Sequence, residues 1–163
     1  MTANAASTSN AAALDGVDLS LIEALQLDGR RSFVELAGLV GLSEATVRQR
    51  VRRMLEARVM QIVAITDPLT LGFRRMCMIG IKIQGALMEA AEALAAFTEV
   101  DYVVVTSGAF DLIVEAVCQD ETHLLALLDR IRAIEGVRDT ETFIYLRLHK
   151  QTYAWGARPP APP

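Results

Sequence analysis

Apolar positions follow two different periods along the chain. Between residues 15 and 58 they recur three or four apart, which predicts amphipathic helices that share a core. From residue 61 onward, alternating apolar and polar positions predict strands, with helical stretches between them. The change of period near residue 60 predicts two domains, and a chain of 163 residues is long enough for two small cores.

The first domain is predicted over residues 15–60 and contains three short helices. Asp18 is predicted to cap the first helix, because an aspartate oxygen can accept the free amide hydrogens of a first turn. The spacing of Ser32 and Glu35 predicts a capping box at the start of the second helix. A short turn with Gly41 leads to the third. This order is typical of a helix-turn-helix or winged-helix-like domain.

The third helix follows Ser43 and carries four arginines within six residues. Its guanidinium groups suit phosphate oxygens and guanine edges, although a solvated charged face is the alternative. Gln49 and Arg53 are predicted to lie nearest the bases, and the others to contact phosphates or to pair within the protein. The predicted core face consists of Val47, Val51, Met54 and Leu55. The candidate DNA-binding residues are Ser43, Glu44, Thr46, Arg48, Gln49, Arg50, Arg52 and Arg53.

The second domain is predicted over residues 75–150, after a linker at 61–74 that begins with a strand at 61–66. Its pattern is strand, helix, strand, strand, helix, strand, with the last strand at 137–148. This order predicts a ferredoxin-like βαββαβ fold, in which two helices cover one face of an antiparallel sheet. The whole chain is therefore expected to belong to the α+β class.

Charge is distributed unevenly between the two domains. The net charge is −4, yet residues 44–58 hold five arginines against two glutamates. Residues 61–150 hold eight basic against thirteen acidic side chains. Such asymmetry indicates a basic DNA-reading surface carried by an acidic domain with a different kind of ligand.

Composition and the chain ends narrow the class of protein. The chain is 52% hydrophobic, and no apolar run approaches the roughly 20 residues of a membrane span. Residues 1–14 and the proline-rich residues 151–163 are predicted to be disordered tails, and the first of these is not a signal peptide. We expect a cytoplasmic protein in which Cys77 and Cys118 are buried, reduced thiols.

Several motifs occur together between Leu14 and Lys150. They are Leu14-Asp15-x-x-Asp18, Leu25-x-x-Asp28-Gly29-Arg30, Glu35-Leu36-Ala37-x-x-Val40-Gly41-Leu42-Ser43, Arg50-Val51-x-x-Met54, Ser107-Gly108-Ala109-Phe110-Asp111 and Gly136-Val137-x-Asp139-Thr140-x-Thr142. In this combination the chain resembles the Lrp/AsnC (leucine-responsive, feast/famine) family of transcriptional regulators. The resemblance implies a DNA-binding helix-turn-helix domain and a βαββαβ domain that forms dimers and larger rings.

The resemblance also implies an effector site in the second domain. In that family the loop at Ser107–Asp111 often binds an amino acid. Asp111 would accept hydrogen bonds from the ammonium group, whereas the alternative is a simple hairpin turn. The candidate effector-binding residues are Ser107, Gly108, Ala109, Asp111, Asp139, Thr140 and Thr142.

The expected partners follow from the same resemblance. They are double-stranded DNA with a pseudo-palindromic operator, an amino-acid effector, and further copies of the chain in a homodimer that assembles to a tetramer or octamer. No catalytic residue, metal ligand or cofactor is predicted, since His123 and His149 lack neighbours at metal-ligand spacing.

Two other functions remain open from the sequence. Some proteins with this domain pair act as tetrapyrrole decarboxylases of siroheme type, which need a basic, histidine-supplied pocket in the second domain. The second domain here is acidic instead. An effector-binding module without DNA binding is disfavoured by the four arginines of the third helix.

The chain departs from the family pattern at the end of the third helix. Arg58 stands where the family usually has a glycine, and Ile62-Val63 replaces a Gly-Tyr-like pair. We therefore expect either a longer helix or a cap made by the Arg58 side chain.

Overall fold

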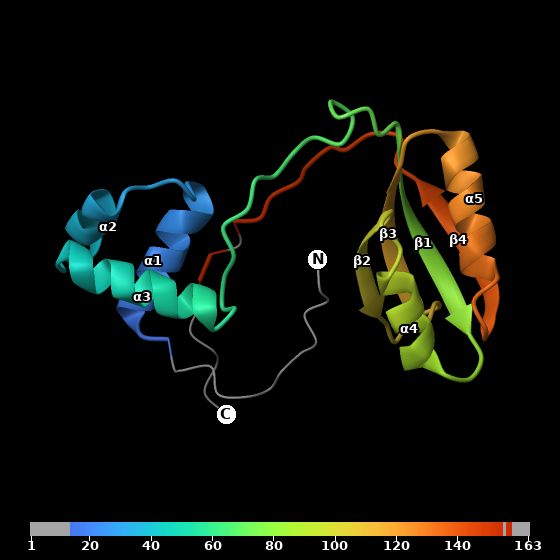
Figure 1. The fold of residues 1–163 in the computed structure, drawn as a ribbon, viewed down its shortest axis with the longest axis horizontal. Helices are drawn as coiled ribbons and strands as arrows, with labels where there is room; N and C mark the ends of the chain where they lie inside the picture. Colours follow the sequence, from blue (N-terminus) through green and yellow to red (C-terminus); the bar gives the residue numbers. More distant parts are fainter. Residues whose placement is uncertain (1–13, 155, 158–163) are drawn as a thin grey trace. The chain divides into compact units, whose positions relative to one another are not determined.

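The computed structural model describes residues 14–154, 156 and 157, and it divides them into two compact units (Figure 1). The first unit contains residues 14–64 together with the described residues from Lys150 onward. The second unit is Ile65–His149. The predicted N-terminal tail lies outside the described residues, except for Leu14.

Three helices form the first unit. Ser32 and Glu35 make the predicted capping box, in which the Glu35 amide donates to Ser32 Oγ over 3.2 Å and the Ser32 amide to Glu35 Oε2 over 2.9 Å. Gly41 has φ +68°, as the turn requires. The helices are α1 (Gly16–Leu27), α2 (Phe33–Val40) and α3 (Glu44–Glu56). The predicted helix-turn-helix is therefore confirmed.

The start of α1 differs from the prediction. Asp15 caps the helix, with its Oδ1 accepting the Asp18 amide over 2.9 Å. Asp18 lies within the first turn, where its carboxylate is fully buried. The prediction that Asp18 caps this helix was wrong. Both aspartates are suitable cap residues, and only packing decides which one enters the helix.

The core of this unit lies between the three helices. Val47, Val51 and Met54 are buried as predicted, whereas Leu55 is 36% exposed. Leu55 lies about 80° around the helix from Val47, because successive residues turn by about 100°. This angle puts Leu55 at the edge of the core face. The fully or almost fully buried residues are Leu21, Ala24, Leu36, Ala37, Val47, Val51 and Met54.

The end of α3 follows neither expected alternative. The helix stops at Glu56, and Arg58 itself adopts the left-handed backbone with φ +56°. Its amide donates to the Leu55 carbonyl over 3.1 Å, and the Val59 amide donates to the Met54 carbonyl over 2.9 Å. A side chain in this conformation carries a steric cost that glycine does not.

We expect Arg58→Gly to stabilise the first unit by roughly 0.5 to 1 kcal/mol. The substitution removes the strain of the left-handed conformation, and the greater freedom of glycine in the unfolded chain offsets part of this gain. Urea unfolding followed by circular dichroism measures the difference. Arg58→Ala serves as the control and brings no gain. Equal stabilisation by both variants would show that the arginine charge, and not the backbone, is responsible.

The second unit is a four-stranded antiparallel sheet in the order β2-β3-β1-β4, with two helices (Figure 1). Buried residues of both helices join one core with Cys77, Ile79 and Ile81 of β1, so the helices cover the same face. The elements are β1 (Arg75–Ile83), α4 (Leu87–Ala95), β2 (Val100–Val105), β3 (Leu112–Cys118), α5 (Glu121–Arg132) and β4 (Val137–Ile144). The predicted ferredoxin-like order is confirmed.

Two predicted strand segments are absent from the described structure. Residues 61–66 form no strand there, and Ile62, Val63 and Ile65 are exposed. The last strand ends at Ile144 and not near residue 148, although the Tyr145 amide still donates to the Met76 carbonyl over 2.9 Å. Alternating apolar residues form a strand only where a neighbouring strand accepts their backbone hydrogen bonds.

The C-terminal segment contacts α1. The Gly156 amide donates to Gln26 Oε1 over 3.1 Å, and the Ala157 amide donates to Glu23 Oε1 over 3.2 Å. The described part of residues 151–157 was predicted to belong to a disordered tail, and these two hydrogen bonds join it to side chains of α1. Residues 158–163 lie outside the described residues.

Cys77 and Cys118 are buried, as predicted, and form no disulfide with each other. Burial raises the pKa of Cys77 to about 11. Among the helices of the described residues, none combines the length and apolar character needed to cross a membrane.

Glu99 connects the start of β2 to α5 and makes the second unit sensitive to acid. Its Oε1 accepts from Arg130 Nη1 over 2.6 Å and lies 3.1 Å from His123 Nε2. Burial by itself raises the pKa of Glu99. Hydrogen bonds from its own backbone amide, from His123 and from Arg130 outweigh this effect and lower the pKa to about 2. The ionised carboxylate therefore stabilises the fold.

Lowering the pH from about 4.5 to about 2 is expected to remove roughly 2 to 3 kcal/mol of stability through Glu99. Its pKa is lower in the folded than in the unfolded protein, so the contribution is complete above the unfolded pKa and is lost as the pH falls through the folded pKa. Urea unfolding across this pH range measures it. Glu99→Gln should flatten the curve in this window, and an unchanged slope in that variant would contradict the assignment.

Candidate functional site

Helix α3, which is predicted to read DNA, exposes one polar face. Ser43 caps it by accepting the Thr46 amide over 3.2 Å, as predicted. Gln49 and Arg52 are exposed on the side opposite the buried Val47 and Val51. A shallow hollow is lined by Thr46, Gln49, Arg50, Arg52, Arg53 and Glu56. Five of the eight predicted DNA-binding residues thus share one surface with Glu56.

Two arginines of α3 form exposed pairs within the helix. Arg48 pairs with Glu44 one turn earlier and lies over the Phe33 ring, 4.5 Å from its centroid. Arg52 Nε donates to Glu56 Oε1 over 2.7 Å. Exposed pairs of this spacing stabilise a helix by only about 0.3 to 0.5 kcal/mol. A phosphate group can therefore replace the carboxylate at little cost.

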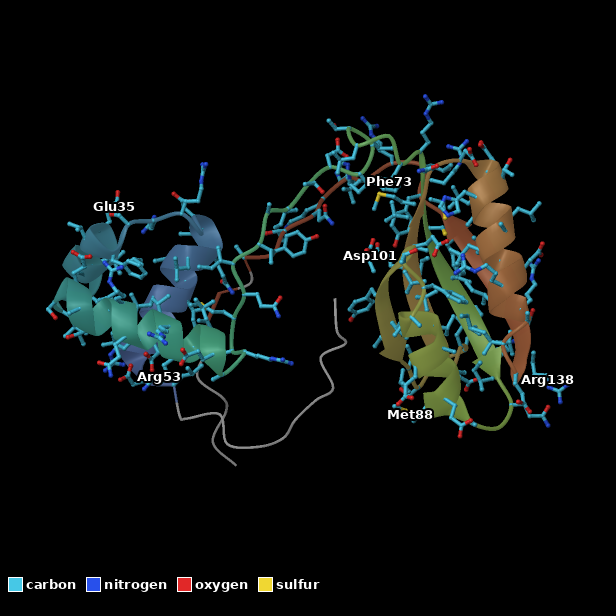
Figure 2. The ribbon with its side chains drawn as sticks, viewed as in Figure 1. Glu35, Arg53, Phe73, Met88, Asp101 and Arg138 are labelled. Atoms are coloured by element: carbon cyan, nitrogen blue, oxygen red, sulfur yellow. The ribbon has the colours of Figure 1, made fainter. Side chains whose placement is uncertain are left out.

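The other two arginines bind a buried carboxylate of α1. Arg50 Nη1 donates to Asp18 Oδ1 over 2.9 Å and to Asp15 Oδ2 over 2.7 Å. Arg53, which projects from α3 in Figure 2, donates through Nη2 to Asp18 Oδ2 over 2.6 Å. The Asp18 amide and Arg50 lower the pKa of Asp15, so it is ionised at neutral pH.

The sequence did not predict that Asp15 and Asp18 would contact the arginines of α3. The Asp-x-x-Asp spacing predicts a helix start, and it contains no sign of partners 32 to 35 residues away. The structure brings the two aspartates and two of the four arginines into one ion-pair cluster.

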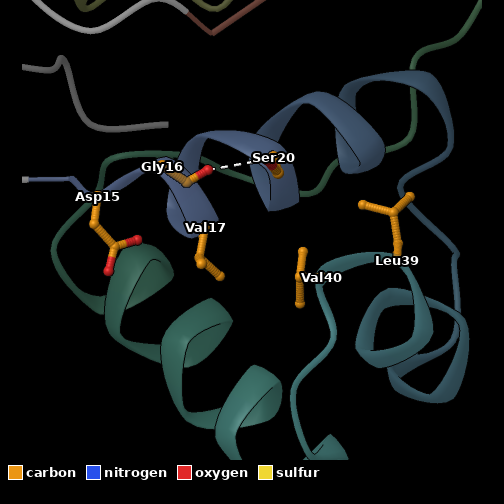
Figure 3. A pocket seen from close by; sticks show the side chains of 6 residues that line it. All are labelled: Asp15, Gly16, Val17, Ser20, Leu39 and Val40. Atoms are coloured by element: carbon orange, nitrogen blue, oxygen red, sulfur yellow. Dashed lines mark hydrogen bonds between the residues drawn. The ribbon is translucent and has the colours of Figure 1, made fainter.

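A second hollow lies between the start of α1 and the end of α2 (Figure 3). Val17 and Val40 point into it, and Ser20 Oγ donates to the Gly16 carbonyl over 2.9 Å. The serine hydroxyl is thereby used within α1. We assign no ligand to this hollow.

The predicted effector loop joins β2 to β3. Ser107, Gly108 and Ala109 are exposed at its tip. Asp111 is anchored to β1, since its amide donates to the Ile81 carbonyl over 3.0 Å and its Oδ2 accepts the Ile83 amide over 2.7 Å. One carboxylate oxygen therefore holds the loop to the sheet.

Phe110 was not among the predicted site residues, yet it seats this loop. Its ring lies on Gly80 of β1, where an added Cβ would approach three ring atoms to 2.6 or 2.7 Å. The ring also packs edge-on against Phe143, with centroids 6.2 Å apart. The glycine within a predicted strand was the available signal, because such a residue often marks a close approach.

The predicted residues of β4 divide between the two faces of the sheet. Asp139 lies opposite Lys82, with 3.7 Å between Oδ2 and Nζ. Thr140 and Thr142 lie opposite Ile81 and Ile79 on the helix-covered face. Thr140 Oγ1 also accepts from Arg132 Nε of α5 over 3.2 Å. The structure thus separates these threonines from Asp139.

Both units match known families. Residues 14–55 match the AsnC-type helix-turn-helix domain, and residues 76–155 match the Lrp/AsnC ligand binding domain. The chain is 35% identical over 141 residues to the HTH-type transcriptional regulator FL11 of Pyrococcus furiosus, covering 85% of this chain and 93% of that protein. The chain belongs to the Lrp/AsnC family. It is a transcriptional regulator with a DNA-binding helix-turn-helix domain and a ligand-binding domain.

Solved structures agree with this assignment. The structure of Escherichia coli AsnC has 29% identity, a TM-score of 0.74, and coverage of 85% of this chain and 95% of that one. A Neisseria meningitidis transcriptional regulator in complex with L-Met has 25% identity, a TM-score of 0.77, and coverage of 86% and 95%. The family resemblance inferred from the motifs is therefore confirmed.

Proposed function

We propose that this Lrp/AsnC regulator reads DNA by inserting α3 into the major groove. The observation that carries the proposal is the division of α3 into a buried face and an exposed polar face with Gln49 and Arg53 at its centre. Amide and guanidinium groups can make paired hydrogen bonds to adenine and guanine edges. The role is binding, and no catalytic step is assigned. Since chromosomal DNA is the partner, the protein acts in the cytoplasm.

The remaining polar residues of α3 anchor the helix to the backbone of the DNA. Arg48 and Arg52 can exchange their exposed carboxylate partners for phosphates. The side chain of Arg50 is only 25% exposed and binds two aspartates, so we assign it to the protein interior. Of the two roles predicted for Arg50, pairing within the protein is the one we propose.

We propose that two copies of the chain bind a pseudo-palindromic operator, with half-sites separated by about one turn of DNA or a multiple. In support, α4 and α5 both pack on one face of the sheet, and the other face carries Met76, Met78 and Phe143. A second copy could cover this face, which also carries Glu115 and Glu141, and further association would give a tetramer or octamer.

We also propose an amino acid as the effector of the second unit. The Neisseria meningitidis relative was solved with L-Met, which supports a ligand of this class. The site would lie at the end of β1 where the Ser107–Asp111 loop and Asp139 meet its last residues, Lys82 and Ile83. The free oxygen of Asp111 would accept hydrogen bonds from the ammonium group. Backbone amides near Gly108 would bind the carboxylate, in place of the two threonines.

Selection of bound duplexes from a random DNA library tests the proposal on the full chain. We expect one enriched motif with two related halves, and a sedimenting species of at least two chains. A monomer at micromolar concentration, or no enriched motif, would contradict this docking.

A thermal-shift screen of the twenty amino acids tests the effector. Asp111→Asn is the preferred variant, because it keeps an oxygen for the Ile83 amide while removing the charge. We expect at least one amino acid to stabilise the native protein more than this variant. Equal stabilisation of both would remove the effector site.

A further inference from the structure

Asp18 is the one charged residue that is fully buried in the described part of the chain, and it lies beneath the DNA-reading helix. Its carboxylate accepts from Arg53 over 2.6 Å, from Arg50 over 2.9 Å and from the Asp15 amide over 3.2 Å. All these contacts come from the start of α1 or from α3. We propose that Asp18 is a positioning residue that holds Arg53 in the orientation needed to read a base. This inference rests on the proposed function of α3.

The two guanidinium groups on Asp18 have different exposures. The side chain of Arg50 is 25% exposed and Asp15 gives it a second carboxylate. The side chain of Arg53 is 46% exposed, and its contact with Asp18 is made through Nη2. Arg50 therefore encloses Asp18 and keeps water from it, while Arg53 has one edge fixed and its remaining N–H groups available.

Breaking the Arg53 pair is unfavourable, unlike breaking the exposed pairs of α3. A buried carboxylate that loses a partner is left without the water that would otherwise solvate it. Arg48 and Arg52 leave exposed glutamates that water solvates readily. Arg53 consequently stays in place when phosphates approach, and its rotamer freedom is lost before DNA binds.

A fixed arginine contributes to discrimination more than to general affinity. A mobile guanidinium can contact phosphates of any sequence, whereas one held by Asp18 satisfies only a base edge at the matching position. Asp18 therefore favours the operator over unrelated DNA by restricting Arg53. The net charge of Asp15, Asp18, Arg50 and Arg53 is zero, so the cluster adds little to long-range attraction.

The test measures the affinities of full-length Asp18→Asn for the selected operator and for an unrelated duplex, at one fixed salt concentration. We expect operator affinity to fall at least tenfold, while affinity for unrelated DNA changes less than threefold. A double-mutant cycle then combines Asp18→Asn with Arg53→Ala. In the double variant, the ratio of operator affinity to affinity for unrelated DNA should equal the ratio measured for Arg53→Ala alone. Additive losses, or an unchanged ratio in Asp18→Asn, would overturn the proposal.

Two controls separate positioning from stability. Arg50→Gln weakens the same cluster but leaves Arg53 on Asp18, so thermal stability should fall while the affinity ratio is retained. Glu56→Gln releases Arg52 from an exposed pair and should also preserve the ratio. If Asp18→Asn does not fold, Asp18→Glu replaces it, because the added methylene displaces Arg53 and should lower the ratio in the same way. If Arg50→Gln lowers the ratio of operator affinity to affinity for unrelated DNA as much as Asp18→Asn does, Asp18 has a purely structural role.

The experiments distinguish a failure of the proposed function from a failure of this inference. If the native protein selects no operator, reading by α3 is wrong. If it selects one and the Asp18 variants keep the same ratio, only the positioning role is wrong.

Discussion

Gln49→Ala is expected to lower affinity for the selected operator by roughly 10- to 100-fold and to relax the sequence preference at one position in each half-site. Gln49 is exposed on α3, and its amide can both donate and accept, as paired hydrogen bonds to an adenine edge require. Fluorescence anisotropy with single-base operator variants measures both effects. Unchanged affinity and preference would show that another face of α3 meets the DNA.

Arg52→Ala provides the contrast on the same helix. Arg52 is expected to contact a phosphate, so its loss should weaken operator and unrelated DNA by similar factors. The slope of log affinity against log salt concentration should also fall by about one for each phosphate contact removed. A change of sequence preference in this variant would indicate that Arg52, and not Gln49, contacts a base edge.

Gly80→Ala is expected to destabilise the second unit by about 1 to 3 kcal/mol, because a methyl group added at a tightly packed contact forces its neighbours to shift. The added methyl group would lie 2.6 to 2.7 Å from the Phe110 ring, so the ring must move from β1. Displacement of Phe110 also disturbs Asp111 and the anchored loop. Chemical unfolding and the amino-acid thermal shift together measure these effects.

Phe110→Ala supplies the matched background for this prediction. Without the ring, the methyl group at position 80 has space, so Gly80→Ala should cost less in that background than in the native chain. The same cost in both backgrounds would show that the clash with Phe110 is not the cause.

The sequence contained the local features of the recognition helix. Ser43, Gly41 and the spacing of Val47, Val51 and Met54 each favour the same helix after the same turn, so its start and most of its core face could be predicted. Capping and helical period depend on residues a few positions apart. Alternating and helical spacing likewise gave the order of elements in the second domain, and the motifs then gave the family.

The same local signals were ambiguous where a residue had two possible partners. The Asp-x-x-Asp motif indicates the start of α1, but it does not show which aspartate is buried. Similarly, the alternation at residues 61–66 indicates a strand only if another strand pairs with it. Arg58 was predicted to end the helix by a side-chain cap or to extend it, and its backbone adopted the left-handed conformation instead.

The sequence by itself thus determined the helix-turn-helix, the order of the ferredoxin-like elements and the family, because these depend on local spacing and on motifs. Only the tertiary structure decided that Arg50 and Arg53 bind Asp18, that Phe110 lies on Gly80, and that Thr140 and Asp139 lie on opposite faces. Each of these contacts joins residues that are distant in the chain or depends on strand register. The register and the packing of α1 against α3 are set by burial of whole faces, which no single motif specifies.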